Sequence, residues 1–224
     1  MVTMKDLAPT TPRSWSPIVM HETGSYIRMN DTRDRLLAAT RRCIAANGLV
    51  GTTSRDIAST ANANLAAITY HFGSKDELVA QALLDGLREW LAPALDVLTS
   101  DEDPPTRATL VIQALLSSFE DQRQDASGYL QALVEAPRIE PLHTGLIQLW
   151  SDLRSLLAAQ VREMQQSGEL DVWIEPEAMA GVIVAIANGL VLQVTVDPDG
   201  PSLTDMAAQF GSLLLNARSR SRTE

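Results

Sequence analysis

Cysteine and aromatic residues are scarce in this chain. Of 224 residues, only Cys43 is a cysteine, and 4% are aromatic. A single cysteine excludes a disulfide framework within the chain and fits a reducing cytosol. We expect Cys43 to be a small buried hydrophobic residue of the first helix rather than a redox sensor. Because alanine and leucine dominate a hydrophobic content of 45%, the composition favours helices over sheets and supports a sizeable core.

Motifs of catalysis, metal binding and secretion are also lacking. The sequence has no P-loop, no dinucleotide-binding fingerprint and no G-x-S-x-G motif. Its three histidines, His21, His71 and His143, have no cysteine or acidic partner at ligand spacing. Residues 1–30 hold no long apolar run of the kind that forms a signal peptide. We therefore predict a cytoplasmic protein that is not an enzyme and has no cofactor, no metal and no membrane anchor.

Charge is distributed unevenly along the chain. The formal net charge is −10, yet residues 31–75 contain six basic and three acidic residues, whereas residues 76–224 carry a net charge of −14. A basic module on an acidic body would meet DNA in one orientation only, because the acidic part would be repelled. Solvated surface charge is the alternative explanation, and the small basic excess does not exclude it.

Residues 52–75, with the sequence TTSRDIASTANANLAAITYHFGSK, predict two short helices joined by a tight turn. Thr53 and Asp56 have the spacing of a capping pair at the start of the first helix. Asn62 tolerates a left-handed backbone in the turn, and Asn64 is expected to cap the second helix. Such a pair, with small uncharged residues leading the second helix, suits the major groove of DNA. An ordinary helical pair of an all-α domain would share these features.

The same residues resemble the DNA-binding signature of the TetR family of bacterial repressors. The matching motifs are T-x-x-x-I-A in residues 53–58 and N-L-A-A-I-x-Y-H-F-G-S-K in residues 64–75, the latter typical of the AcrR-like branch. The resemblance is strong over about residues 31–91 and departs at Asn62, where the family usually has glycine. It implies an all-α fold, in which an N-terminal three-helix helix-turn-helix domain is joined by a long helix to a C-terminal helical ligand-binding and dimerisation domain.

The domain organisation is predicted from helical periodicity together with this resemblance. We expect Asn30 to cap the first helix and Pro93 to bend or end the helix that begins at Lys75. Helices are expected at about residues 31–47, 53–61, 65–72, from 75 to or beyond Pro93, and at 106–122, 127–135, 142–167, 179–196 and 202–217. The predicted domains are a mobile extension at 1–29, the helix-turn-helix at 30–75, the regulatory and dimerisation domain at 76–218, and a tail at 219–224.

Contacts with double-stranded DNA are implied by the resemblance and by the positions of residues at helix starts. The residues expected nearest base edges are Arg55, Asn64, Leu65, Ala66 and Ala67. Those expected near phosphates are Thr53, Tyr70, His71 and Lys75. The predicted DNA-binding residues are Thr53, Ser54, Arg55, Asn64, Leu65, Ala66, Ala67, Thr69, Tyr70, His71 and Lys75. A homodimer would place two such units on a palindromic operator.

The apolar segment at residues 179–196 is nearly long enough to cross a bilayer. Asn188, Gln193 and Thr195, and the absence of flanking Lys or Arg, argue against a membrane span. A helix hydrophobic on nearly all sides is expected to be buried both by its own domain and by a partner. With the last helix it would form the four-helix dimer interface that the resemblance implies. The predicted interface residues are Leu190, Val194, Met206, Phe210, Leu213 and Leu214.

A small-molecule pocket is predicted among the C-terminal helices, because pockets in helical bundles are mainly apolar and lie between helices. Gln148 or His143 would supply a polar group. The predicted lining is Leu115, Phe119, Tyr129, Leu146, Trp150, Leu153, Met179 and Ile183. Each of these residues is also explained as ordinary core, so the prediction concerns the cluster.

The predicted function is that of a homodimeric, nucleoid-associated repressor that a small-molecule ligand of unknown identity releases from its operator. The alternative is a DNA-binding protein of the same fold with a structural or protein-partner role and no effector. A cavity that can enclose a ligand would favour the repressor, and a filled core would favour the alternative.

Overall fold

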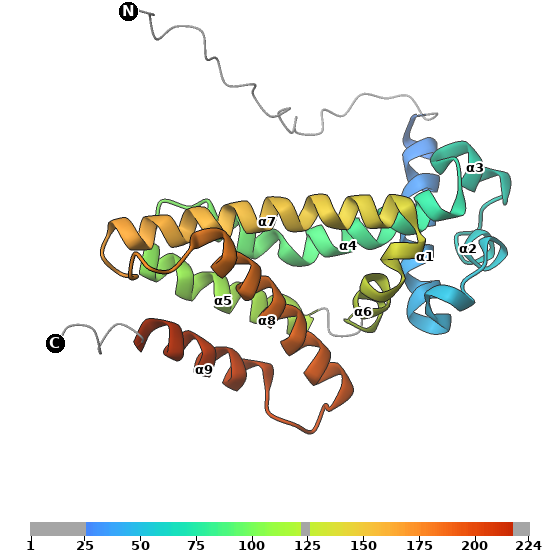
Figure 1. Ribbon diagram of the computed structural model, residues 1–224. Coiled ribbons are helices and arrows are strands. Elements are labelled where there is room, and N and C mark those ends of the chain that lie inside the picture. The colour runs from blue at the N-terminus through green and yellow to red at the C-terminus, as the bar shows by residue number, and fades with distance from the viewer. Residues whose placement is uncertain (1–25, 122–125, 217–224) are drawn as a thin grey trace, which may run out of the picture.

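The computed structural model describes residues 26–121 and 126–216, and side chains within residues 32–119 and 126–212. All regular elements of these residues are helical (Figure 1). Most of the predicted extension at 1–29 and the predicted tail at 219–224 lie outside the described residues. The helices are α1 (Tyr26–Gly51), α2 (Ser54–Thr60), α3 (Ala66–Phe72), α4 (Lys75–Leu98), α5 (Pro104–Asp121), α6 (Ala126–Glu135), the 3₁₀ turn η2 (Ala136–Arg138), α7 (Glu140–Gln166), α8 (Pro176–Val196) and α9 (Leu203–Asn216).

Helices α1, α2 and α3 and the start of α4 form one unit, which we call the N-terminal unit. Its core is filled by Leu36 of α1, Ile57 of α2, Ile68 of α3 and Leu78 of α4, all of them buried. Because α2 and α3 have seven residues each, they are too short to be stable alone. Their packing on the two long helices therefore fixes where α3 lies.

The first helix is longer than the sequence pattern predicted. It begins at Tyr26, so Asn30 lies inside the helix and the prediction that Asn30 caps it was wrong. Residues 26–30 contain neither glycine nor proline, so nothing in them interrupts the helix. At its other end, Gly48 has a φ of 73° and interrupts the helix, which resumes for one further turn.

Helix α4 connects the N-terminal unit to the remaining helices, which we call the C-terminal unit (Figure 1). Pro93 lies inside α4, and the helix continues through it to Leu98. Proline cannot donate to the carbonyl of residue 89, but Pro93 is exposed, which leaves that carbonyl on the solvent side of the helix. Helix α4 therefore extends from the core of the N-terminal unit to the core of the C-terminal unit.

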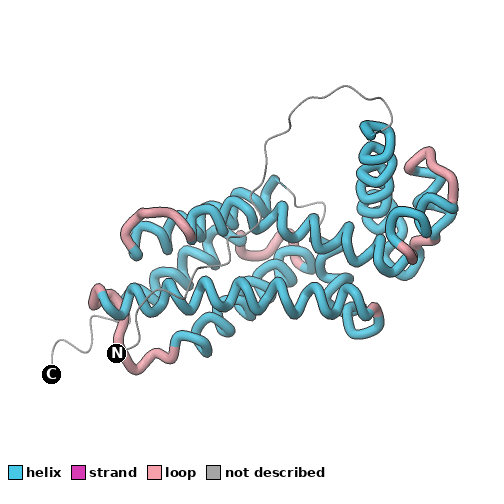
Figure 2. Tube along the Cα trace, turned by 90° about the horizontal axis from the view of Figure 1, so that it is seen from above, coloured by secondary structure: helices cyan, strands magenta, loops and turns pink. Residues whose placement is uncertain are grey.

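The C-terminal unit is a helical bundle in which α4 packs against α5 and α7, and α7 packs against α8. Seen from above, the long helices of the bundle run alongside one another (Figure 2); α4 and α7 are in contact, and α1 packs against α4 and α6. The buried residues Ala94, Leu98, Val111, Leu157 and Val184 form a core near the far end of α4. The short helix α6 contacts α1, α4 and α8, so it is a second connection between the units.

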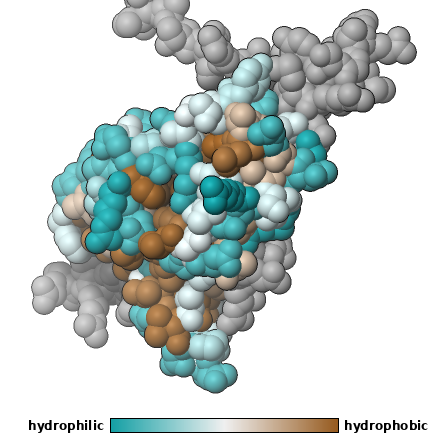
Figure 3. All heavy atoms as spheres, turned by 90° about the vertical axis from the view of Figure 1, so that its right-hand side faces the viewer, coloured by the Kyte–Doolittle hydropathy of each residue, from teal (hydrophilic) through white to brown (hydrophobic). Residues whose placement is uncertain are grey.

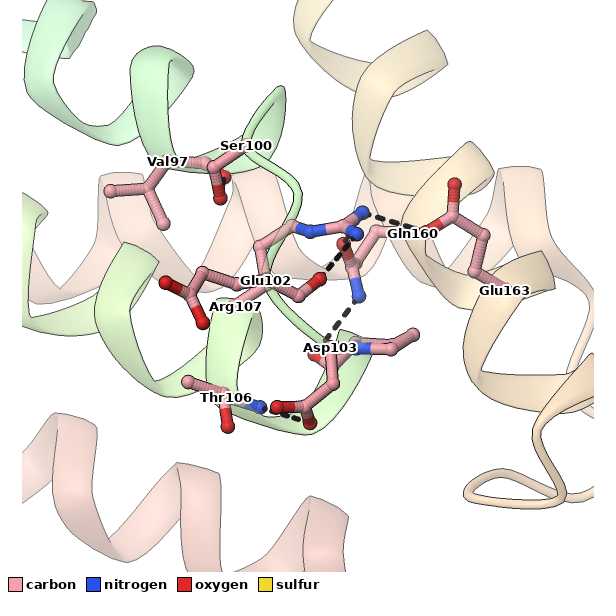
Figure 4. A network of polar contacts seen from close by, with 9 residues as sticks. Val97, Ser100, Glu102, Asp103, Thr106, Arg107, Gln160 and Glu163 are labelled. Carbon is pink, nitrogen blue, oxygen red and sulfur yellow. Dashed lines mark hydrogen bonds and ion pairs between the residues drawn. The ribbon is translucent and has the colours of Figure 1, made fainter.

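Arg107 closes the bundle at the end remote from α3 (Figure 4). Its guanidinium donates to a Glu163 carboxylate oxygen at 2.6 Å, to Gln160 Oε1 at 3.0 Å and to the carbonyl oxygen of Glu102 at 2.7 Å. The Gln160 amide in turn donates to the carbonyl oxygen of Pro104 at 3.1 Å. The Arg107 side chain is only 12% exposed, so solvent screens these bonds weakly. The network ties α5 and the loop before it to α7.

Candidate functional site

The start of α2 is held by a reciprocal cap. The Asp56 N–H donates to Thr53 Oγ1 at 3.2 Å, and the Thr53 N–H donates to Asp56 Oδ2 at 3.0 Å, which confirms the predicted capping pair. The Thr53 hydroxyl also donates to Asp56 Oδ2, and these hydrogen bonds from Thr53 lower the pKa of Asp56. Because its hydrogen is engaged in the cap, the Thr53 hydroxyl would have to leave Asp56 before donating to a DNA phosphate.

The turn between α2 and α3 is made by asparagines, as predicted. Asn62 has a φ of 50° and is the sole non-glycine residue with a positive φ in the described part of the chain. Asparagine adopts this left-handed geometry more readily than most residues. Asn64 Oδ1 accepts a hydrogen bond from the Ala66 N–H at 2.9 Å, which satisfies a free donor at the start of α3. The turn therefore sets both the angle and the starting point of α3.

Helix α3 presents a nearly uncharged face to solvent. Tyr70 is 72% exposed and Leu65 is 47% exposed, while Ile68 on the opposite side is buried. The Tyr70 and His71 rings pack edge to face at 4.9 Å. The guanidinium of Arg33 lies 5.3 Å from the centre of the Phe72 ring, a cation–π contact that brings a charge beside α3.

Every residue predicted to contact DNA keeps some exposed surface, and together they surround α3 and the start of α2. Thr53, Arg55, Asn64, Leu65, Ala66, Thr69 and Tyr70 are exposed, and Ser54, Ala67, His71 and Lys75 are half-buried. Lys75 donates to the carbonyl oxygen of Thr52, so it also fastens α4 to the segment before α2. An ammonium group has three donor hydrogens, and this bond uses one.

A cavity of about 270 Å³ lies within the C-terminal unit. Its wall is mainly apolar and comes from α4, α5, α6, α7, α8 and α9. Seven of the eight residues predicted to line a pocket are in this wall: Leu115, Phe119, Tyr129, Trp150, Leu153, Met179 and Ile183. The eighth, Leu146, packs instead in a separate buried cluster with Leu84 and Leu87.

The polar groups of this cavity differ from those that the sequence suggested. Neither Gln148 nor His143 lines it, and the Gln148 amide donates to Asp152 on the exposed side of α7. The polar pair in the wall is Tyr129 and Asn188, whose Oη and Oδ1 atoms lie 2.5 Å apart. Burial raises the pKa of Tyr129 to about 12. Both tyrosine and asparagine are therefore uncharged at neutral pH.

A smaller cavity of about 60 Å³ lies where α1, α4 and α6 meet. Trp90 and Tyr129 line both cavities, and their ring centres are 5.4 Å apart. Beside it, the Leu49 N–H donates to Gln131 Oε1 at 2.7 Å, which joins α1 to α6. The ion pair between Arg41 and Glu89, at 2.6 Å, joins α1 to α4. Sequence reasoning missed this junction, because its partners are far apart along the chain.

The outer face of α8 is apolar and unpaired. Residues spaced four and three apart form this face, which we call the α8 stripe. Its members are Ala178, Val182, Ala185, Gly189, Leu192 and Val196. Val182, Leu192 and Val196 are 47%, 49% and 74% exposed. Figure 3 shows hydrophobic residues at several places on the face that it draws, some of them in its lower part.

The residues predicted for a dimer interface lie elsewhere. Val194 is buried, Leu190 and Phe210 line the large cavity, and Met206 packs on the same cluster as Val194. These four side chains therefore pack at least partly against their own subunit, and Leu190, Met206 and Phe210 are half-buried. The side chains of Leu213 and Leu214 lie outside the described residues.

Helix α8 is also long and apolar enough to cross a membrane, by length and composition alone. The core helix of a soluble protein passes the same test, and α8 packs against α6, α7 and α9. Among the described side chains, no group of three or more His, Cys, Asp or Glu residues could hold a metal ion.

Two family models match this chain. Residues 36–82 match the bacterial regulatory proteins of the tetR family, and residues 104–216 match the C-terminal domain of BetI-type transcriptional repressors. The first covers α2, α3 and parts of α1 and α4, and the second begins at α5. Both the unit that carries α3 and the unit that carries the cavity are therefore matched.

Curated relatives and solved structures agree with these matches. The nicotine-responsive repressor HdnoR of Paenarthrobacter nicotinovorans is 27% identical over 79% of this chain and 90% of its own. The repressor KstR2 of Mycobacterium tuberculosis is 31% identical over 56% of this chain and 66% of its own. A transcriptional regulator from Pseudomonas aeruginosa PAO1 superposes with a TM-score of 0.73 at 21% identity, covering 83% of this chain and 88% of that one.

A transcriptional regulator from Saccharomonospora viridis, solved in complex with choline, superposes with a TM-score of 0.69 at 23% identity, covering 80% of this chain and 93% of that one. At these identities the solved structures show a shared fold. The family model of the C-terminal half and the exposed α3 after a capped turn lead to the same conclusion. The chain belongs to the TetR family of transcriptional regulators, which bind DNA and are not enzymes.

Proposed function

We propose that this regulator is a homodimeric repressor that binds a palindromic operator and leaves it when a small molecule fills the large cavity. The observation that supports the effector most is the mainly apolar cavity of about 270 Å³, close to the lower end of the volume range of small-molecule sites. A DNA-binding protein with a purely structural role has no need of such a space. Two similar proteins are described with small molecules, nicotine for HdnoR and choline for the Saccharomonospora regulator.

DNA binding is assigned to the exposed face of α3 and the start of α2. The small side chains of Ala66 and Ala67 let the backbone of α3 approach base edges, and Arg55 supplies a long donor beside them. Tyr70, Lys75 and His71 lie at the other end of α3 and are assigned to phosphates. The body carries most of the negative charge, so this face meets DNA with the least repulsion.

Dimerisation is assigned to the α8 stripe. A second copy of the chain is its proposed occupant, because the stripe is continuous along the helix and carries no charged side chain that would need water. Burying such a face against its own symmetry mate removes apolar surface from water in both subunits. Two N-terminal units then reach successive major grooves, about 34–36 Å apart.

The effector acts, in this proposal, through the wall that the two cavities share. A ligand that moves Trp90 or Tyr129 toward the smaller cavity presses on α1 through α6, where Gln131 holds the Leu49 N–H. The position of α3 relative to the dimer axis then changes. The ligand shifts this equilibrium only as far as it binds the DNA-free state more tightly, and a preference of roughly a hundredfold is about 2.7 kcal/mol.

The test begins with selecting operator sequences from a random DNA pool with the purified protein. Apolar small molecules are then screened for thermal stabilisation of the protein, and operator affinity is measured with each stabilising compound. We expect stabilising compounds to weaken operator binding by roughly a hundredfold, for the reason just given. Compounds that occupy the cavity and leave operator affinity unchanged would contradict the proposal and support a structural role.

A further inference from the structure

The polar groups in the wall of the large cavity are few and uncharged. Among the described residues that line it, six carry a nitrogen or oxygen in the side chain, and none is Asp, Glu, Lys, Arg or His. The six are Trp90, Thr109, Tyr129, Trp150, Gln160 and Asn188. Since apolar surroundings make an unpaired polar group costly, the partners of these six groups indicate what a ligand has to supply.

Five of the six side chains have hydrogen-bond partners within the protein. The Thr109 hydroxyl donates to the carbonyl oxygen of Pro105, and Gln160 bonds to Pro104 and Arg107. The Tyr129 hydroxyl donates to Asn188 Oδ1 and is also hydrogen-bonded by the Trp150 side chain. These interactions already occupy the hydroxyls of Thr109 and Tyr129 and the indole of Trp150.

The sixth group, the indole N–H of Trp90, is buried and has no hydrogen-bond partner. The ring is held in place by Tyr129, at 5.4 Å between ring centres, and by Phe119, at 6.3 Å. Trp90 lines both cavities, but its indole nitrogen has almost no accessible surface, so an acceptor reaches the nitrogen only when the ring moves. An indole N–H can only donate, so the missing partner is an acceptor.

We propose that the effector is a neutral, largely apolar molecule with one acceptor oxygen, such as a ketone or ester carbonyl, that accepts a hydrogen bond from Trp90 Nε1. This inference rests on the proposed ligand-responsive function and specifies the ligand for that site. A carboxylate or an amine would lose its hydration and find no opposite charge among the described residues of the wall. The neutral oxygen loses less on leaving water and gives the buried indole N–H of Trp90 an acceptor.

The experiment compares three probes with similar alkyl chains and different polar groups. 2-Undecanone offers a neutral acceptor, undecanoate an anion and decyltrimethylammonium a cation. Binding is measured by titration calorimetry for the wild type, Trp90→Phe and Trp150→Phe. The Trp150→Phe control removes an identical N–H from the same wall, but one that already bonds to Tyr129. The indole nitrogen signals of ¹⁵N-labelled wild type are followed in the same titrations.

We expect 2-undecanone to bind more tightly than either charged probe, and Trp90→Phe to weaken its binding at least tenfold and more than Trp150→Phe does. The Trp90 indole signal of the wild type should move downfield when the ketone binds, a readout that does not depend on how a variant folds. Equal ketone affinity in the wild type and Trp90→Phe, an unmoved indole signal, or tighter binding of a charged probe would overturn the inference. The same holds if no methyl ketone of eight to fourteen carbons binds.

Operator release is measured separately, so that the two proposals fail in different ways. A ketone that binds through Trp90 without lowering operator affinity supports the ligand chemistry and contradicts the ligand-responsive repressor. A charged probe that releases the operator supports the repressor and overturns the ligand chemistry.

Discussion

The start of α4 packs in a filled core, and its far end lines a cavity. At its start, Leu78 and Ala82 have no exposed surface and fill the core of the N-terminal unit. At its far end, Ala94 and Leu98 border a cavity of about 270 Å³. Reading DNA requires that α3 be held rigidly, which a filled core achieves. Admitting a ligand requires space that a filled core does not leave. Helix α4 meets both requirements because it runs from the filled core of the N-terminal unit to the wall of the cavity.

Truncating a side chain should therefore cost more in the N-terminal unit than in the cavity wall. Ile57→Ala removes a fully buried side chain and should lower the free energy of unfolding by about 2–5 kcal/mol. Leu153→Ala in the cavity wall should lower it by about 1 kcal/mol, because the deleted atoms already face empty space. Urea unfolding of both variants measures the difference, and equal losses would mean that the cavity is filled in solution.

The α8 stripe should prove as important for DNA binding as α3 itself. Leu192→Glu places a charge on the stripe and should produce a monomer whose operator affinity falls roughly a hundredfold, because the two units no longer bind together. Val134→Glu is the control, since Val134 is 70% exposed on α6 and lies off the stripe. Sedimentation and operator titration measure both effects. A dimeric Leu192→Glu protein with normal affinity would show that another surface joins the subunits.

No pattern in the sequence indicates which side of α8 would meet a partner. Leu190 and Leu192 are two positions apart, which is about 200° around a helix, so they face opposite sides. On a helix apolar all round, hydrophobicity cannot show which side faces the subunit's own core. The structure directs Leu190 toward the cavity and leaves Leu192 exposed.

Local features, by contrast, could be predicted from sequence alone. The cap formed by Thr53 and Asp56 and the left-handed Asn62 depend on residues a few positions apart. Most of the residues predicted for a pocket also line the cavity, because inward-facing apolar residues follow helical spacing. The contact of Gln131 with Leu49 and the unpaired indole of Trp90 depend on how distant helices pack. No pattern in the sequence indicates such contacts.

Lys75 has two roles, a proposed contact with a DNA phosphate and a hydrogen bond within the protein, and a salt titration can separate them. Lys75→Ala should weaken binding to all DNA sequences by a similar factor, and the slope of log affinity against log salt should fall by about 0.9 if the ammonium meets one phosphate. Lys75 also donates to the Thr52 carbonyl oxygen, so part of the loss comes from a less firmly held α2. Weaker binding with an unchanged slope would mean that the structural role of Lys75 accounts for the whole loss of affinity.

Arg55→Ala, placed nearer base edges, should instead alter which sequences are selected.

The smallest expected effect concerns the helix caps, in which the two units are alike. Hydrogen bonds from Thr53 lower the pKa of Asp56 at the start of α2, and hydrogen bonds from Thr106 lower that of Asp103 at the start of α5. A carboxylate whose pKa is lower in the folded state stabilises that state at pH values above its unfolded pKa, here 3.8. This stabilisation is lost as the pH falls through the folded pKa.

Asp56→Asn and Asp103→Asn should therefore each make the free energy of unfolding depend slightly less on pH in the acid range below about pH 4. Urea unfolding at a series of pH values measures that dependence. Thr53→Val keeps the Asp56 carboxylate and removes its hydroxyl donor, so it should weaken the same dependence, because that hydroxyl is the largest cause of the lowered pKa. An unchanged pH dependence in both asparagine variants would mean that the carboxylates titrate alike in the folded and unfolded chain. A change in one variant only would show that the caps, like the cores, differ between the two units.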